Sequence, residues 1–166
     1  LGSMMESGLD ASSAERLIAW GAAINMALKN PLTGVGIGGF HYNFYDYTDV
    51  WVGRAMDVHS TWFQVLSEAG FLSFALYIAA LITAIIALYG ASRRADNDNL
   101  DPHLQAHALG FLASGIGLLV TATFISNAFS GIFFGLICIS HLLAQVTKGI
   151  GARQDGFQRA KVRITS

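Results

Sequence analysis

His59 is the residue best placed to do chemistry, because it lies about a dozen residues before an apolar segment that begins at Phe71. An imidazole titrates near neutral pH and can accept a proton during catalysis. Residues 71–89 are uncharged and long enough to cross a bilayer. The spacing therefore predicts a proton acceptor near a membrane surface, where a lipid-borne substrate could reach it. Taken alone, a histidine at this position is also open to a purely structural interpretation.

Arg16 is the second candidate, because it lies at the start of a predicted helix. The sequence Ser12-Ser13-Ala14-Glu15 matches a capping box, and we expect the helix over residues 12–30, before Pro31. The first turn of a helix favours anions, so a guanidinium there could bind a phosphate. A surface arginine that extends into solvent is the alternative. Five residues at helical spacing predict one apolar face: Leu17, Trp20, Ile24, Ala27 and Leu28.

A glycine-rich segment follows, and residues 34–39 formally satisfy the pattern G-x-G-x-x-G. A dinucleotide-binding loop must follow a strand and open a helix. Here a predicted helix precedes the glycines and an aromatic run follows them, so a nicotinamide-dependent enzyme is excluded. We expect a tight backbone path whose amides lie close to a ligand or a neighbouring helix, with an anion nest and a simple turn both open.

Residues 40–51 are rich in aromatic side chains, and residues 57–70 are predicted to form a helix leading into the membrane. The aromatic composition is typical of anchoring at a membrane interface. The same rings could stack on sugars, and the sequence does not separate the two roles. His59 and Glu68 are nine residues apart on the predicted helix, about half a turn out of phase, so we expect no direct pair between them.

The composition indicates a membrane protein. Hydrophobic residues make up 53% of the 166 residues and charged residues only 13%, against about a quarter in soluble domains. Residues 71–89, 108–125 and 128–146 contain no Asp, Glu, Lys or Arg. These runs predict an all-α, polytopic membrane protein fragment with three transmembrane helices, preceded by an extracytoplasmic segment over residues 1–70. Glycines and serines in the last two runs would permit close helix approach.

The distribution of Lys and Arg predicts the orientation. Arg93 and Arg94 follow the first span, and the tail 148–166 carries five basic residues, so both lie on the cytoplasmic side. Residues 1–70, with His59, then face the periplasm. The net charge is −1, and without a basic stripe no nucleic-acid partner is expected.

No metal or cofactor is predicted. His103 and His107 have a spacing that can hold a metal from one helical face, but no third ligand accompanies them. His141 is interpreted as a packing residue within the third span. Residues 92–104 are expected to form a polar loop, residues 126–127 a tight turn, and the tail after Gly149 to be frayed.

Three motifs in order carry a family resemblance. They are Arg16-x-x-x-Trp20, then the segment 30–40 (NPLTGVGIGGF), then the segment 59–71 (HSTWFQVLSEAGF). Together they resemble the C-terminal portion of the O-antigen ligase and O-antigen polymerase superfamily. The resemblance is closest to the O-glycosylation ligases associated with exosortase systems, which favour His-Ser over His-Asn.

The resemblance implies a glycosyltransferase of cell-envelope polysaccharide biosynthesis in the bacterial inner membrane. It would transfer a glycan from a polyprenyl-diphosphate donor, such as undecaprenyl diphosphate, to an acceptor hydroxyl on the periplasmic face. By analogy His59 is the general base and Arg16 binds the departing diphosphate, while Glu68 matches the family pattern and is a candidate supporting residue. Arg54, five residues before His59, is a weaker candidate for binding the diphosphate. The acceptor would be a lipid or protein for a ligase, or a glycan for a polymerase.

A non-catalytic transporter or scaffold module is the alternative, although the spans lack the ionisable residues that ion pathways use. The family's earlier helices, which should supply another cation and the lipid groove, do not occur in this sequence. We therefore expect the 166 residues to be part of a longer chain and to be inactive alone.

Overall fold

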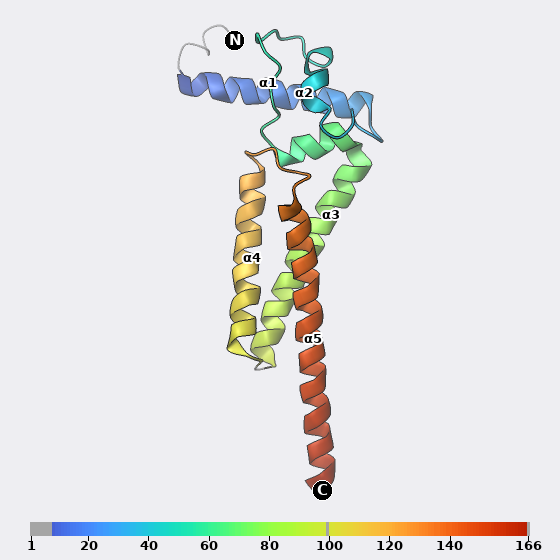
Figure 1. The fold of residues 1–166 in the computed structure, drawn as a ribbon, viewed down its shortest axis with the longest axis vertical. Coiled ribbons are helices and arrows are strands. Elements are labelled where there is room, and N and C mark those ends of the chain that lie inside the picture. The colour runs from blue at the N-terminus through green and yellow to red at the C-terminus, as the bar shows by residue number, and fades with distance from the viewer. Residues whose placement is uncertain (1–7, 99, 166) are drawn as a thin grey trace. The chain divides into compact units, whose positions relative to one another are not determined.

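The computed structural model describes residues 8–98 and 100–165, and the side chains of residues 12–96, 98 and 100–157. These residues form helices without strands, as predicted (Figure 1). The chain divides into two compact units, residues 1–78 with 119–129 and residues 79–118 with 130–166. The elements are α1 (Gly8–Lys29), α2 (Phe40–Asn43), the 3-10 turn η2 (Phe44–Asp46), α3 (Thr61–Asn97), α4 (Pro102–Ala122) and α5 (Gly131–Thr165).

Three helices are long and apolar enough to cross a membrane. The candidate spans are Thr61–Asp96, Pro102–Ala122 and Gly131–Phe157. Many of their large apolar side chains are exposed, including Leu76, Ile86 and Val120. A chain in water would bury such residues, whereas a lipid-facing helix presents them outward. The predicted architecture, with three apolar spans, is confirmed.

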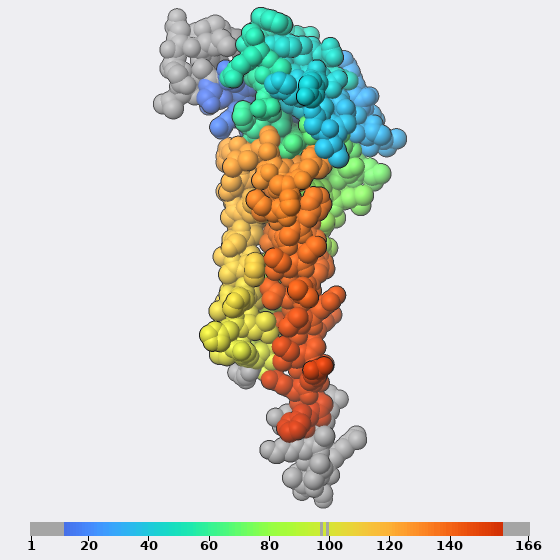
Figure 2. All heavy atoms as spheres, viewed as in Figure 1, coloured from blue at the N-terminus to red at the C-terminus, as the bar shows by residue number. Residues whose placement is uncertain are grey.

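The core of the first unit forms between α1 and the segment that follows it. Small residues of α1 allow close approach, and Figure 1 shows α2 lying against α1. In Figure 2 residues 40–60 cover the middle of α1. The buried cluster consists of Ala19, Ala22, Ala23 and Met26 from α1 with Phe40, Phe44, Met56 and Val58.

The predicted apolar face of α1 is only partly correct. Ala27 is buried and Trp20 packs against the core, but Leu17 and Leu28 are 65% and 63% exposed. The alanine face is buried instead, because the Phe40 and Phe44 rings need the space that small residues leave. The stripe of larger residues remains on the outer surface of α1.

Several predicted boundaries also differ from the structure. The helix expected over residues 12–30 begins at Gly8, so the capping box at Ser12 is wrong. The helix expected over 57–70 begins only at Thr61 and continues through a kink at Gly70 into the first span. Residues 40–46 form short helical turns rather than an irregular aromatic run.

The second unit shows longer helices than the sequence suggested. α3 continues to Asn97 and α4 begins at Pro102, so most of the expected polar loop at 92–104 is helical. α5 continues to Thr165, so the tail expected to be frayed is helical. A Cβ at Gly115 would lie 3.2 Å from Ile85 Cδ1 and 3.4 Å from Leu136 Cδ1. The predicted close approach through glycine is therefore confirmed at Gly115.

Candidate functional site

The glycine-rich segment and the kink of α3 form one interlocked structure. Gly70 adopts φ 79° and ψ 177°, which breaks the helical hydrogen-bond pattern around it. The carbonyl of Ser67 accepts a hydrogen bond from Val35 N at 2.9 Å, and that of Glu68 accepts one from Gly36 N at 3.0 Å. Phe71 N donates to the Pro31 carbonyl at 2.8 Å. The loop thus satisfies backbone groups that the kink releases.

Glu68 reinforces this contact with its side chain, which is only 4% exposed. Its Oε2 accepts a hydrogen bond from Gly38 N at 2.9 Å, and its Oε1 accepts one from Phe40 N at 3.3 Å. The amides of Gly38 and Phe40 thus bind a carboxylate of α3, so the glycine segment lies close to a neighbouring helix, as one of the interpretations left open had it. Glu68 positions the loop and does not line the cavity described below.

His59 lies just before α3 and not within it, so its predicted place on a helical face is wrong. Among the described non-glycine residues it alone has a positive φ, 47°. The neighbouring backbone is held firmly: Val58 and Ser60 are buried, and Trp20 Nε1 donates a hydrogen bond to the Val58 carbonyl at 3.0 Å. The exposed imidazole therefore projects from a fixed backbone position.

Trp20 connects this backbone to α1. Its ring stacks on Phe63, the ring centroids lying 5.0 Å apart. The Arg-x-x-x-Trp motif thus has a structural explanation, because its tryptophan fixes the residue before His59. The start of α3 is also anchored to the 123–129 segment, where Thr61 Oγ1 donates to the Ile125 carbonyl at 2.6 Å and Trp62 Nε1 donates to Thr123 Oγ1 at 3.2 Å.

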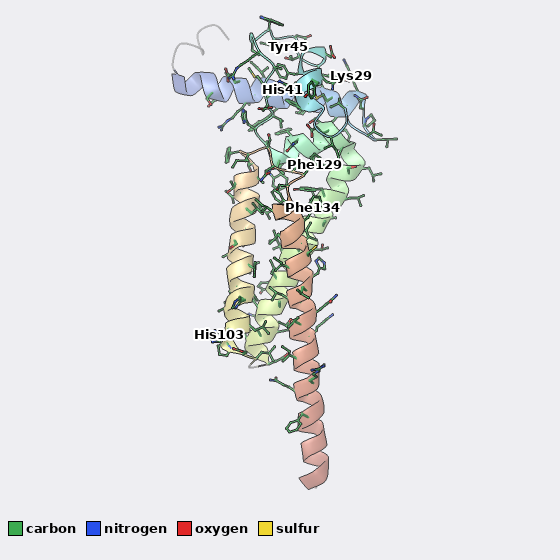
Figure 3. All side chains as sticks on the ribbon, in the orientation of Figure 1. Lys29, His41, Tyr45, His103, Phe129 and Phe134 are labelled. Atoms are coloured by element: carbon green, nitrogen blue, oxygen red, sulfur yellow. The ribbon has the colours of Figure 1, made fainter. Side chains whose placement is uncertain are left out.

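A cavity of about 430 Å³ lies beside His59. Two ion pairs cross its wall: Arg54 Nη2 lies 3.6 Å from Glu15 Oε2, and His41 Nδ1 lies 3.5 Å from Asp57 Oδ1, provided that His41 is protonated. Figure 3 shows His41 on α2. The lining residues are Glu15, His41, Arg54, Ala55, Met56, Asp57 and His59.

The structure brings together two of the predicted site residues, Arg54 and His59, and adds three that the sequence analysis missed. Glu15, His41 and Asp57 carried no signal of their own. Glu15 was interpreted as a helix cap, and His41 lies within the aromatic run. Only the packing of residues 40–59 on α1 brings these side chains to one cavity.

Arg16 lies outside the cavity lining. It is half-buried, and its Cζ lies 5.9 Å from the centroid of the Phe124 ring. It is one helical turn before Trp20, which bonds to the residue preceding His59. Among the described side chains no carboxylate forms an ion pair with Arg16, unlike Arg54. Its charge is therefore available to an anionic ligand.

No group of three or more His, Cys, Asp or Glu side chains in the described part of the chain could hold a metal ion. His103 and His107 thus have no third ligand there. His141 Nδ1 lies 2.9 Å from the carbonyl of Ile137, one turn earlier in α5. These histidines are structural or surface residues in the described geometry.

Comparison with known families identifies the region that contains this cavity. A family model described as O-Antigen ligase matches residues 2–78, which include Arg16, the glycine segment, His59 and Glu68. Over these residues the family predicted from the motifs is therefore confirmed, and this family suggests a role in membrane glycan transfer. No match to the chain was found among curated proteins or solved structures. The exosortase association stays a prediction.

Proposed function

We propose that this O-antigen ligase region belongs to a membrane glycosyltransferase that moves a glycan from a polyprenyl-diphosphate donor to an acceptor hydroxyl. One observation carries the proposal: within the matched region, the exposed His59 imidazole lines a 430 Å³ cavity while its backbone neighbours are buried. A side chain held in this way is suited to a reaction in which a proton must be removed at a defined point.

His59 acts as the general base in the proposed reaction. It takes the proton of the acceptor hydroxyl as that oxygen attacks the anomeric carbon of the donor sugar. The bond between the anomeric carbon and the diphosphate oxygen breaks, and the polyprenyl diphosphate leaves with the bonding electrons. Positioned base catalysis of this kind contributes roughly 10²–10⁴ in rate. The proton later passes from His59 to solvent.

Arg16 binds the diphosphate in this proposal. Its guanidinium can form two parallel hydrogen bonds to phosphate oxygens, which become more negative as the bond to the sugar breaks. The absence of a carboxylate partner among the described side chains supports this role, because the guanidinium need not be released from an ion pair first. A ligase and a polymerase would share this step and differ only in the acceptor.

Substitution of His59 tests the proposed reaction. We expect His59→Ala in the full-length protein to lower transfer from undecaprenyl-diphosphate-linked glycan in membrane vesicles by at least about 100-fold. The protein level, measured by immunoblotting, should not change. His103→Ala is the matched control, because His103 is exposed and lies in the second unit. Transfer by His59→Ala at the wild-type rate would show that His59 is not the base.

A further inference from the structure

One face of α1 is apolar and exposed along most of the helix. Leu17 and Leu28 are 65% and 63% exposed, and Ile24, which lies between them, is 42% exposed. An α-helix turns by about 100° per residue, so these three side chains fall within about 40° of one another over about three turns. We refer to them as the outer stripe. Single exposed apolar residues are common, whereas an aligned set of this kind indicates an interaction surface.

We infer that the outer stripe is embedded in the membrane leaflet on the His59 side, so that α1 lies in the plane of the membrane interface. The contacts of α1 within the first unit carry this inference. They show which face of the helix is already covered by protein, and they place both ends of the stripe at the level where the chain enters the membrane.

The opposite face of α1 is covered by protein. Its small residues, among them Ala19, Ala22 and Ala23, are buried against the Phe40 and Phe44 rings. On a helical projection this alanine face is roughly opposite the outer stripe. The helix therefore has two apolar faces, one packed against the segment that follows it and one left open. A helix that lies between a protein core and lipid needs both.

The C-terminal end of the stripe lies where α3 enters its apolar run. Leu32 follows shortly after α1 and is 72% exposed. A Cβ at Gly70 would lie 2.7 Å from the Leu32 carbonyl carbon, and Phe71 N donates a hydrogen bond to the Pro31 carbonyl at 2.8 Å. Phe71 is the first residue of the uncharged run 71–89 and is itself 43% exposed. This end of α1 is therefore at the level of the membrane surface.

The N-terminal end of the stripe is at a membrane surface as well. Arg16, beside the first stripe residue, has its Cζ 5.9 Å from the centroid of the Phe124 ring. Residues 123–130 connect α4 to α5, which are both candidate membrane spans, so Phe124 lies at one surface of the membrane. Thr61 Oγ1 donates to the Ile125 carbonyl at 2.6 Å, which places this connection beside the start of α3 and thus on the same side.

A helix that is held at the membrane surface near both ends lies along that surface. Within the first unit, Figure 1 shows α1 running across, and not along, the part of α3 that follows the kink. An apolar helix face in this position typically inserts about 5–10 Å into the boundary between headgroups and acyl chains. The lipid contact is continuous with that of the exposed Phe71. Because Glu15 of α1 lines the His59 cavity, insertion of α1 also fixes the height of that cavity above the membrane.

Spin labelling of the full-length protein in lipid nanodiscs tests the inference. In a cysteine-free background that includes Cys138→Ala, a nitroxide is attached at Leu17→Cys, Ile24→Cys and Leu28→Cys, and its collisions with oxygen and with a water-soluble nickel chelate are measured. We expect collisions with oxygen to dominate at all three positions, because oxygen concentrates in lipid and the chelate is excluded from it. Tyr42→Cys is the matched control: it is 87% exposed on α2, and the chelate should dominate there.

Two results would overturn the inference. Collisions with the chelate that are as frequent at the stripe as at Tyr42→Cys would show that the stripe faces water. Labels that are immobilised and shielded from both reagents would show that another protein segment covers the stripe instead of lipid. Leu32→Cys leaves α1 unaltered and should behave like the stripe, so it gives the same test if a label distorts the helix. The measurement requires no glycan transfer, so failure of His59→Ala to reduce transfer would count against the proposed function alone.

Discussion

His59 illustrates how a single residue can combine strain with accessibility. A non-glycine residue at positive φ costs of order 1–3 kcal/mol and persists only where the surroundings hold it. Here the Trp20 hydrogen bond to Val58 and the burial of Val58 and Ser60 supply that constraint. Histidine is among the residues that tolerate this conformation better than most. The backbone strain at His59 is thus offset by these contacts, which also fix the position from which the imidazole extends.

The strain at His59 yields a prediction that separates stability from activity. His59→Gly should relieve the positive φ of 47°, whereas His59→Ala should retain it. We expect the glycine variant to be more stable than the alanine variant by about 1 kcal/mol, and both to lose transfer. Thermal unfolding of the full-length protein in detergent measures the difference. A glycine variant that is less stable than the alanine variant would mean that the φ of His59 is not strained.

At the scale of elements, the glycine segment and the kinked helix α3 act as one part. Five acceptor oxygens near the kink, on Ser67, Glu68 and Pro31, each accept a hydrogen bond from one backbone amide. The donors are the amides of Val35, Gly36, Gly38, Phe40 and Phe71. A Cβ at Gly70 would lie 2.7 Å from the Leu32 carbonyl carbon. Glycine is therefore required there for contact as well as for backbone conformation.

A comparison of two glycines with the same φ distinguishes the need for close contact from the need for a positive φ. Gly70 and Gly53 both have φ 79°, but nothing lies within 4 Å of a Cβ built at Gly53. Gly53→Ala should cost about 1 kcal/mol through backbone strain alone. Gly70→Ala should cost about 2–3 kcal/mol more, because the loop must move away from the helix. Equal unfolding temperatures for the two variants would contradict the interlocked arrangement.

The sequence predicted the helices much better than their ends. Uncharged runs of sufficient length identified all three spans, because a helix that crosses a bilayer needs about 20 mostly apolar residues and no particular tertiary contact. The start of α3 could not be predicted, since Thr61 is anchored by Ile125 and Trp62 by Thr123, more than 60 positions along the chain. The buried face of α1 was missed for a similar reason. Its alanines are buried because they pack against Phe40 and Phe44, which lie outside α1.

The site was predictable only where a residue has an unusual chemical identity. His59 and Arg54 were identified and do share a cavity. The partners Glu15, His41 and Asp57 were not, because ordinary charged residues in a loop resemble any solvated surface. Glu68 was identified without a role, and its hydrogen bonds to Gly38 and Phe40 explain it. Side-chain partners across 28 and 30 positions cannot be read from periodicity.

At the scale of the whole molecule, the proposed chemistry requires the first unit to lie outside the cytoplasm. In a background of Cys138→Ala, which removes the chain's single cysteine, we expect Trp51→Cys to react with a membrane-impermeant maleimide in spheroplasts. Arg93→Cys should react only after the membrane is permeabilised, because basic residues remain on the cytoplasmic side. Both positions are exposed. The reverse labelling pattern would place His59 on the cytoplasmic side and contradict the proposed site.

The central claim is that His59 takes the proton of the acceptor hydroxyl while Arg16 binds the donor diphosphate. A density map of the full-length protein with a bound undecaprenyl-diphosphate-linked glycan tests it most directly. We predict phosphate density at the Arg16 guanidinium, and the anomeric carbon at the mouth of the cavity, where an acceptor oxygen could lie about 3 Å from the imidazole. Phosphate density away from the Arg16 guanidinium, or a donor sugar out of reach of His59, would contradict the account.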